Sequence, residues 1–154
     1  MTTMTRDQTV VLRAATRADL PAVEQLLTAS SLPLAGVAEN LESFVVAESD
    51  GQLVGVAGLE VCCNNALLRS TAVDPAWRGR GVGRQLVERV IAEAEARGIR
   101  ALYLLTTTAE HYFPSFGFAR TTREAVPEEV RATAEFQGAC PASAVVMSRA
   151  LAAA

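Results

Sequence analysis

The sequence predicts an α+β (α/β) fold in which helices flank a mixed, mostly antiparallel central sheet. Three observations support this prediction. Short apolar strands in the first half are separated by tight turns, a Gly-rich segment leads into a long amphipathic helix, and a buried strand follows that helix. A chain of 154 residues, of which 50% are hydrophobic, suits one domain over residues 1–154.

The N-terminal segment is predicted to form a strand and then two helices. The alternating stretch around Val10 to Arg13 indicates the strand. Thr16 suits the cap of the next helix, because Asp19 stands at its third position and Pro21 in its first turn. A second, shorter helix is expected over Leu34 to Leu41.

The next three strands are predicted to form an antiparallel meander over Phe44 to Glu48, Leu53 to Val61 and Ala66 to Val73. The first turn contains Asp50-Gly51, which supplies the positive φ angles of a tight hairpin. Asn64-Asn65 marks the second turn. The meander therefore accounts for most of the antiparallel part of the sheet.

A strand–helix–strand unit occupies the middle of the chain. Asp74-Pro75 ends its first strand, a helix is predicted from Gly83 to Arg97 with Gly98 as its stop, and a buried strand follows over Ile99 to Thr106. Because such a unit makes a crossover, its two strands are expected to be parallel. Three further elements are predicted: a short helix over Thr108 to Ser115, a helical fragment near Pro127 to Thr133, and a last strand near Ala144 to Arg149.

The Gly-rich segment between the third meander strand and the helix predicts an anion-binding loop. Its glycines lack the Cβ atoms that block a phosphate, so successive backbone N–H groups can point at one pyrophosphate near the positive end of the helix dipole. The spacing is neither that of a nucleoside-triphosphate loop nor that of a Rossmann fold. The alternative interpretation is a connector with solvated arginines. The segment consists of Arg78, Gly79, Arg80, Gly81, Val82, Gly83 and the adjoining Arg84.

Composition excludes several classes of function. The formal net charge is −3, every basic side chain is arginine, and no face-wide excess of positive charge suits a nucleic-acid partner. The first residues lack the apolar core of a signal peptide and no apolar run has the length of a membrane span, so a cytoplasmic location without membrane contact is expected. The three cysteines, an odd number, are expected to be free thiols.

The anion loop resembles the coenzyme A signature of the GNAT superfamily of N-acetyltransferases, Gln/Arg-x-x-Gly-x-Gly/Ala, which Arg78, Gly81 and Gly83 match. The resemblance runs over nearly the whole chain and includes the Asp50-Gly51 hairpin and Phe116-Gly117-Phe118. It implies the GNAT fold, with a splayed pair of parallel strands, and an enzyme that uses acetyl-CoA as co-substrate. It also implies a homodimer.

A finer resemblance is to the arsenic-resistance (ArsN-type) N-acetyltransferases. It rests on Ala66-Leu67-Leu68-Arg69-Ser70, on residues Leu102 to Ala109 and on residues Cys140 to Ala144. This resemblance implies a small-molecule amine as acceptor, amino-acid-like or organoarsenical, and a link to arsenic or toxin resistance. A protein or peptide amine is the alternative acceptor. A non-catalytic acetyl-CoA-binding sensor is the alternative function.

The GNAT resemblance implies where the co-substrate binds. Pantetheine is expected in the wedge between the splayed strands, hydrogen bonded to the backbone of Thr71, Ala72 and Val73, with a backbone N–H near Val73 polarising the thioester carbonyl. The pyrophosphate is expected on residues 78–84. Thr107 and Thr108 either hydrogen bond pantetheine or cap the helix at Ala109, and Phe113 is expected beside the co-substrate.

Two residues are candidates for proton transfer. Glu60 is the best carboxylate for a general base, since it lies at the end of the strand beside the expected acceptor cleft; an exposed strand-end glutamate is the alternative. Many GNAT enzymes have a tyrosine four positions before the Gly of the Gly-Phe pair, where this chain has Phe113. The adjacent Tyr112 is the candidate acid, provided that the segment near Pro114 departs from a regular helix.

Three residues are candidate acceptor contacts: Arg69, Ser70 and Cys140. The planar fork of Arg69 suits an acceptor carboxylate, although a structural role is equally open. No metal site is expected. The three thiols of Cys62, Cys63 and Cys140 would suit trivalent arsenic only if the fold brought them together.

Overall fold

The computed structural model describes residues 9–151, which form one seven-stranded sheet in the order β1-β2-β3-β4-β5-β7-β6. Neighbouring strands are antiparallel except β4 and β5, which are parallel. The predicted mixed, mostly antiparallel sheet with one parallel pair is therefore confirmed. The strands are β1 (Val11–Ala14), β2 (Phe44–Ser49), β3 (Gln52–Cys62), β4 (Asn65–Val73), β5 (Ala101–Thr106), β6 (Ala119–Thr121) and β7 (Val145–Ala150).

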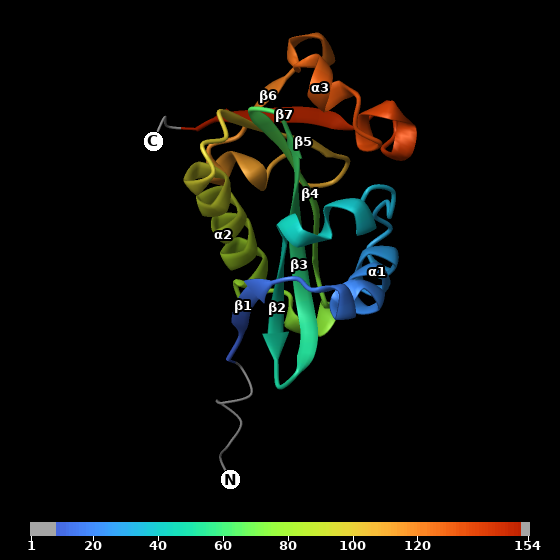
Figure 1. Cartoon of the computed structure of the whole chain (residues 1–154), viewed down its shortest axis with the longest axis vertical. Helices are drawn as coiled ribbons and strands as arrows, with labels where there is room; N and C mark the ends of the chain where they lie inside the picture. Colours follow the sequence, from blue (N-terminus) through green and yellow to red (C-terminus); the bar gives the residue numbers. More distant parts are fainter. Residues whose placement is uncertain (1–8, 152–154) are drawn as a thin grey trace.

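Helices cover both faces of the sheet (Figure 1). On one face α2 (Val82–Ala96) buries an apolar stripe that includes Leu86 and Val90. On the other face α1 (Leu20–Ala29) buries Val23 and Leu27. The short α3 (Glu128–Arg131) contributes Val130 to a third cluster. The middle strands are consequently buried on both faces, which explains their near-continuous apolar sequence. Among residues 9–151 no helix is long and apolar enough to cross a membrane.

Three segments differ from the predicted elements. The helix expected over residues 34–41 is instead a 3-10 helix, η3 (Ala38–Ser43), because Gly36 takes a φ of 85° that an α-helix cannot continue through. The helix expected over residues 108–115 shrinks to η5 (Phe113–Phe116). The π-helical η7 (Glu135–Ala139) and the three-residue strand β6 were not predicted, because neither is long enough to show a period. Three short 3-10 helices complete the fold: η2 (Arg17–Asp19), η4 (Pro75–Trp77) and η6 (Arg123–Ala125).

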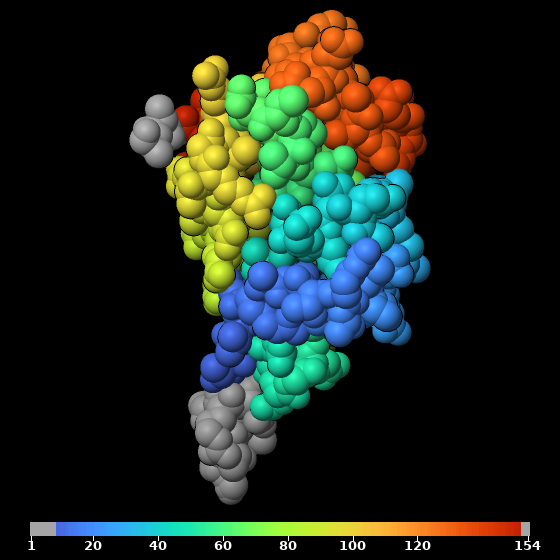
Figure 2. Space-filling model, viewed as in Figure 1, coloured from blue at the N-terminus to red at the C-terminus, as the bar shows by residue number. Residues whose placement is uncertain are grey.

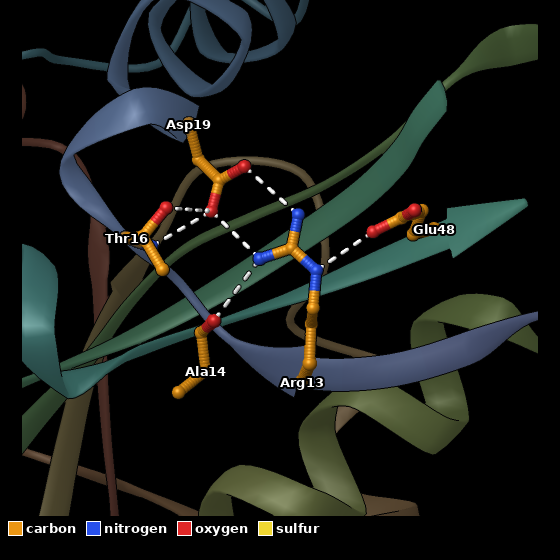
Figure 3. Close-up of polar contacts among 5 residues, drawn as sticks. All are labelled: Arg13, Ala14, Thr16, Asp19 and Glu48. Carbon is orange, nitrogen blue, oxygen red and sulfur yellow. Dashed lines mark hydrogen bonds and ion pairs between the residues drawn. The ribbon is translucent and has the colours of Figure 1, made fainter. Parts of the chain in front are cut away.

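Arg13 ties β1 to the start of α1 and to β2 (Figure 3). Its Nη1 and Nη2 donate to the Asp19 carboxylate at 2.8 and 2.9 Å, and its Nε donates to Glu48 at 2.7 Å. Asp19 Oδ2 also accepts from the backbone N–H of Thr16 at 2.7 Å, so the predicted pairing of Thr16 with Asp19 forms. The guanidinium holds the pKa of the Asp19 carboxyl well below its usual range.

We expect Asp19→Asn to lower the free energy of unfolding by about 1–3 kcal/mol at pH 7, because the largely buried Asp19 side chain loses the charge that pairs with the partly exposed Arg13 guanidinium. The folded-state pKa of Asp19 is lowered, so its stabilisation is present above the ordinary aspartate pKa of about 4 and is lost as the pH falls. Urea unfolding at pH 7 and pH 3 measures this. The control is Glu48→Gln. Glu48 pairs with the same guanidinium but is more exposed than Asp19, so we expect a smaller loss in the free energy of unfolding. A variant deficit that stays the same at both pH values would contradict the role of Asp19.

Candidate active site

The parallel strands β4 and β5 separate soon after they pair. Only residues Asn65–Leu67 of β4 pair with β5, opposite residues 101–103. Further along β4, Ser70 has a φ of 61°, and the β3–β4 register shifts so that Ser70 and Thr71 together oppose a single residue of β3. Such a β-bulge bends the strand that carries it. The bend turns the second half of β4 away from β5 and opens a wedge between them.

A cavity of about 210 Å³ lies in this wedge. Its walls come from β4 and β5, and it is closed by the loop after α1, by residues 108–113 and by the segment around η7. Figure 2 shows the loop after α1 lying against the C-terminal orange-red segment at this end of the molecule. The lining residues are Leu32, Pro33, Leu68, Arg69, Ser70, Thr71, Leu104, Leu105, Thr106, Thr108, Ala109, Tyr112, Phe113, Glu135 and Cys140.

Arg69 lies in the cavity wall with a side chain that is 0% exposed. Its Nη1 donates to Glu60 Oε1 at 2.9 Å and its Nε donates to Ser70 Oγ at 3.0 Å. Glu135 Oε2 stands 3.5 Å from the same Nε. One buried guanidinium therefore forms ion pairs with two carboxylates. They come from β3 and η7, which are far apart in the sequence.

The loop after α1 closes over this guanidinium. Arg69 Nη2 donates to the carbonyl oxygen of Pro33 at 3.4 Å. A Cβ atom on Gly36 would stand only 2.7 Å from Arg69 Nη1, so a glycine is needed both for this contact and for its left-handed φ. Asn40 Nδ2 donates to the Gly36 carbonyl at 2.7 Å and holds the loop in place.

The two carboxylates on Arg69 lie in different surroundings. Glu135 lines the cavity and is 4% exposed, and burial raises its pKa against the opposing effect of Arg69. The Cys140 thiol lies beside Glu135, and burial next to that carboxylate raises the pKa of the thiol to about 11. Glu60 is bonded to Arg69 but is absent from the cavity wall.

The Gly-rich loop has the geometry that an anion-binding loop requires. Gly79 and Gly81 have φ values of 78° and 83°, and a Cβ atom on either would meet nothing within 4 Å. The space before the first residues of α2 is therefore open, and backbone N–H groups of a helix start face it. Arg78 Nε donates to the Val73 carbonyl at 3.2 Å, and the Arg80 guanidinium lies 4.8 Å from the centre of the Trp77 ring.

Tyr112 lies between this loop and the cavity. Its hydroxyl is 3.5 Å from the point where a Cβ atom on Gly83 would stand, and the residue also lines the cavity. Its neighbour Phe113 lines the cavity too and packs edge-to-face on Phe118, with ring centres 5.8 Å apart. Both adjacent side chains reach the cavity because the backbone here is a turn followed by a 3-10 helix. Burial raises the pKa of Tyr112, and Arg84 opposes the shift.

Residues 40–120 match the family model of the acetyltransferase (GNAT) domain. The chain belongs to the GNAT acetyltransferase family. An amino-acid acetyltransferase of Mycobacterium tuberculosis (strain ATCC 25618 / H37Rv) is 31% identical over 140 residues, which are 84% of this chain and 80% of that protein. An amino-acid acetyltransferase of Pseudomonas fluorescens (strain Pf0-1) is 34% identical over 89 residues. Those residues are 56% of this chain and 21% of the Pseudomonas protein, so the match spans about a fifth of that relative.

Two solved structures that contain coenzyme A share this GNAT fold. The N-acetylglutamate synthase of Neisseria gonorrhoeae, complexed with coenzyme A and N-acetyl-glutamate, has a TM-score of 0.81 and 25% identity, over 94% of this chain and 35% of that one. A Mycobacterium tuberculosis protein in complex with coenzyme A has a TM-score of 0.78 and 26% identity, over 92% of this chain and 99% of that one. The GNAT domain is thus an acyl-CoA-dependent N-acetyltransferase, with acetyl-CoA as its co-substrate.

The threonines at the end of β5 take separate places in this GNAT domain. Thr107 is exposed and is not part of the cavity wall, whereas Thr106 and Thr108 are. The expected capping role falls to Thr106, whose Oγ1 accepts from the backbone N–H of Ala109 at 2.9 Å. Side chains alternate along a strand, so an error of one position at the end of β5 exchanges the two faces. Thr108 thus lines the cavity, and the pantetheine contact of Thr107 stays a prediction.

The three cysteines do not converge. Cys62 donates to the Glu60 carbonyl at 3.4 Å, Cys63 is exposed, and Cys140 pairs with Glu135. Within the described residues no group of three or more His, Cys, Asp or Glu side chains could hold a metal ion. The three-thiol arsenic site, which required all three cysteines in one place, is therefore not formed in this structure.

Proposed function

We propose that this GNAT domain transfers an acetyl group from acetyl-CoA to the amine of a small, amino-acid-like acceptor in the cavity between β4 and β5. The observation that carries the proposal is the buried group of opposite charges in the wall of an otherwise apolar cavity. A free amino acid is a zwitterion and offers both signs of charge within a few atoms. The amino-acid acetyltransferases among the relatives support the same acceptor class.

The residues present fit acetyl-CoA, which supplies an activated acetyl group. The open space before α2 suits the pyrophosphate, with residues 78–84 as its partners. The backbone of Thr71, Ala72 and Val73 lies beyond the bulge, where β4 has left β5, so its N–H and C=O groups have no partner strand on that side. An extended pantetheine arm would supply that partner, and these backbone groups orient it.

On the acceptor side, Arg69, Ser70 and Cys140 form part of the cavity wall. The ArsN-like segments that contain these residues support an organoarsenical amino acid as one acceptor, with a role in arsenic or toxin resistance. The homodimer, the cytoplasmic location and the single domain over residues 1–154 stay predictions. Size-exclusion chromatography with light scattering tests the first of these.

An acceptor screen tests the proposed function. Purified protein and acetyl-CoA are incubated with the common amino acids, arsenic-containing amino-acid analogues and short peptides, and products are identified by mass spectrometry. We expect acetylation of a small amino acid with a kcat/KM at least about tenfold above that of any peptide, since a cavity of about 210 Å³ suits a small ligand. Tight coenzyme A binding without turnover of any amine would favour the sensor interpretation, and faster peptide acetylation would favour the protein acceptor.

We expect Tyr112→Phe to lower kcat by about 100-fold, the usual contribution of a positioned proton donor. Tyr112 lines the cavity in which the thioester would lie, and its phenol, whose pKa is raised by burial, is protonated at neutral pH. Tyr103→Phe is the matched control, because Tyr103 is the other tyrosine and packs in the cluster under α3. Steady-state kinetics with the fastest acceptor of the screen measure both variants. Equal rates for wild type and Tyr112→Phe would exclude Tyr112 as the acid.

A further inference from the structure

Of the two carboxylates on Arg69, only Glu135 reaches the cavity. Glu60 Oε1 accepts the shorter bond from Arg69, at 2.9 Å, and its side chain is outside the wall. Glu135 is held loosely, with 3.5 Å between its Oε2 and Arg69 Nε, and it is in the wall. Glu60 is thus the tight partner of the guanidinium, and Glu135 retains acceptor capacity toward the cavity.

The charges of this cluster do not balance. One guanidinium faces two carboxylates, so the ionised cluster carries one excess negative charge beside an apolar cavity. A buried excess charge is costly unless a partner of opposite sign supplies the compensation. An alkylammonium group that enters the cavity is such a partner. It is also the form in which a free amino acid presents its nitrogen at neutral pH.

We propose that Glu135 binds the acceptor ammonium and acts as the general base that deprotonates it, whereas Glu60 keeps Arg69 in position. This inference rests on the proposed function and deepens it. It replaces Glu60 as the base expected from the sequence. It also gives Arg69 a different role from the predicted carboxylate clamp: the guanidinium favours the ionised form of Glu135, which is the form that accepts a proton from the ammonium.

The proton balance of this role is complete. The ammonium gives one proton to Glu135, which leaves a neutral amine and a carboxylic acid. The nitrogen then bonds to the acetyl carbon, the carbon–sulfur bond breaks, and the thiolate takes a proton from the candidate acid Tyr112, which also lines the cavity. The nitrogen, now bonded to the acetyl carbon, gives a second proton to the Tyr112 phenolate. Glu135 releases to solvent the proton that it took from the ammonium. The sum is one amide, one thiol and one proton.

The pH dependence follows from the groups around Glu135. Arg69 on β4 favours its ionised form, whereas burial, Glu60 on β3 and the nearby apolar wall favour its neutral form. The nearby Cys140 thiol stays protonated at neutral pH, because its pKa is raised to about 11 by burial and Glu135 against the opposing charges of Arg69 and Arg123. The pKa of Glu135 is raised overall. As the pH falls, Glu135 is therefore protonated, and activity is lost, at a pH above the ordinary glutamate pKa.

The test compares Glu135→Gln with Glu60→Gln, two amide variants around one guanidinium. Acceptors are the fastest amino acid of the screen, beginning with L-glutamate, and aminooxyacetate, whose nitrogen is already neutral at pH 7. For the amino acid we expect Glu135→Gln to lower kcat/KM by about 100-fold and to remove the acidic limb of the pH profile, while Glu60→Gln keeps that limb. For aminooxyacetate we expect Glu135→Gln to lose less than about fivefold, because no base is needed.

Two outcomes overturn the inference: an equal loss with both acceptors, or an acidic limb that disappears in Glu60→Gln and persists in Glu135→Gln. If Glu135→Gln does not fold, Glu135→Asp keeps a carboxylate and must keep the acidic limb at a reduced rate. Calorimetric titration with coenzyme A separates the inference from the proposed function. Unchanged coenzyme A affinity with the losses above supports Glu135, whereas a wild type that acetylates no amino acid refutes both.

Discussion

Gly81→Glu is expected to weaken coenzyme A binding by at least about 100-fold, because two effects act at one point. The new side chain fills the open space in front of the α2 N-terminus, where a Cβ atom would meet no protein atom within 4 Å. Its negative charge also repels the pyrophosphate and offsets the helix dipole. Isothermal titration with coenzyme A measures the loss.

The chain offers a closely matched control for this variant in Gly98. Both glycines flank α2, have φ values of 83° and 74°, and would add a Cβ atom into empty space. Gly98→Glu therefore imposes a similar backbone strain at the other end of the same helix. We expect it to lower the melting temperature at least as much as Gly81→Glu, because a negative charge is unfavourable at a helix C-terminus, and to leave coenzyme A affinity intact. Equal affinity losses in the two variants would contradict the loop assignment.

Arg69→Met is expected to lower the free energy of unfolding by about 3–5 kcal/mol, because it leaves two carboxylates without their buried counter-charge. The loss should grow as the pH rises from 5 to 8. Without the guanidinium the folded-state pKa of Glu135 rises further above its unfolded value, and a group of that kind loses stability once the pH passes the unfolded pKa. Urea unfolding across this range measures the effect.

A second substitution tests whether charge is the cause. In Arg69→Met/Glu135→Gln the more deeply buried of the two uncompensated carboxylates is gone, and we expect part of the stability to return and its pH dependence to flatten. Arg120→Met is the comparison on the surface, since Arg120 pairs with Glu110 at 2.7 Å with a side chain that is 68% exposed. We expect it to cost less than about 1 kcal/mol. A loss in Arg69→Met that is independent of pH and of Glu135 would indicate packing rather than charge.

The elements that could be predicted are those that depend on neighbouring residues. Asp50 and Gly51 take the positive φ angles that their turn requires, and Thr16 pairs with Asp19 as a cap. Gly79 and Gly81 take left-handed angles before α2. Each of these features follows from the conformational range or the hydrogen-bonding groups of a few adjacent residues, and such local preferences survive in any compact fold.

The residues that line the cavity could not be predicted in the same way. Glu60 was the better candidate from the sequence because it stands near the end of a recognisable strand, whereas Glu135 lies in a π-helical turn without any period. Which carboxylate faces the cavity depends on how η7 folds back over β4, and no local preference encodes that. Tyr112 reached the cavity as proposed, but only because the following backbone is irregular.

By itself the sequence determined the sheet with its parallel pair, the glycine loop before α2 and the family to which the chain belongs. These are matters of period, turn chemistry and short-range geometry. Only the tertiary structure decided that Arg69 is wholly buried, that two distant carboxylates share it, and that one of them lines the cavity. The physical reason is that burial and charge pairing are properties of surfaces brought together by the whole fold, through a bulge at Ser70 and a loop closed by Gly36.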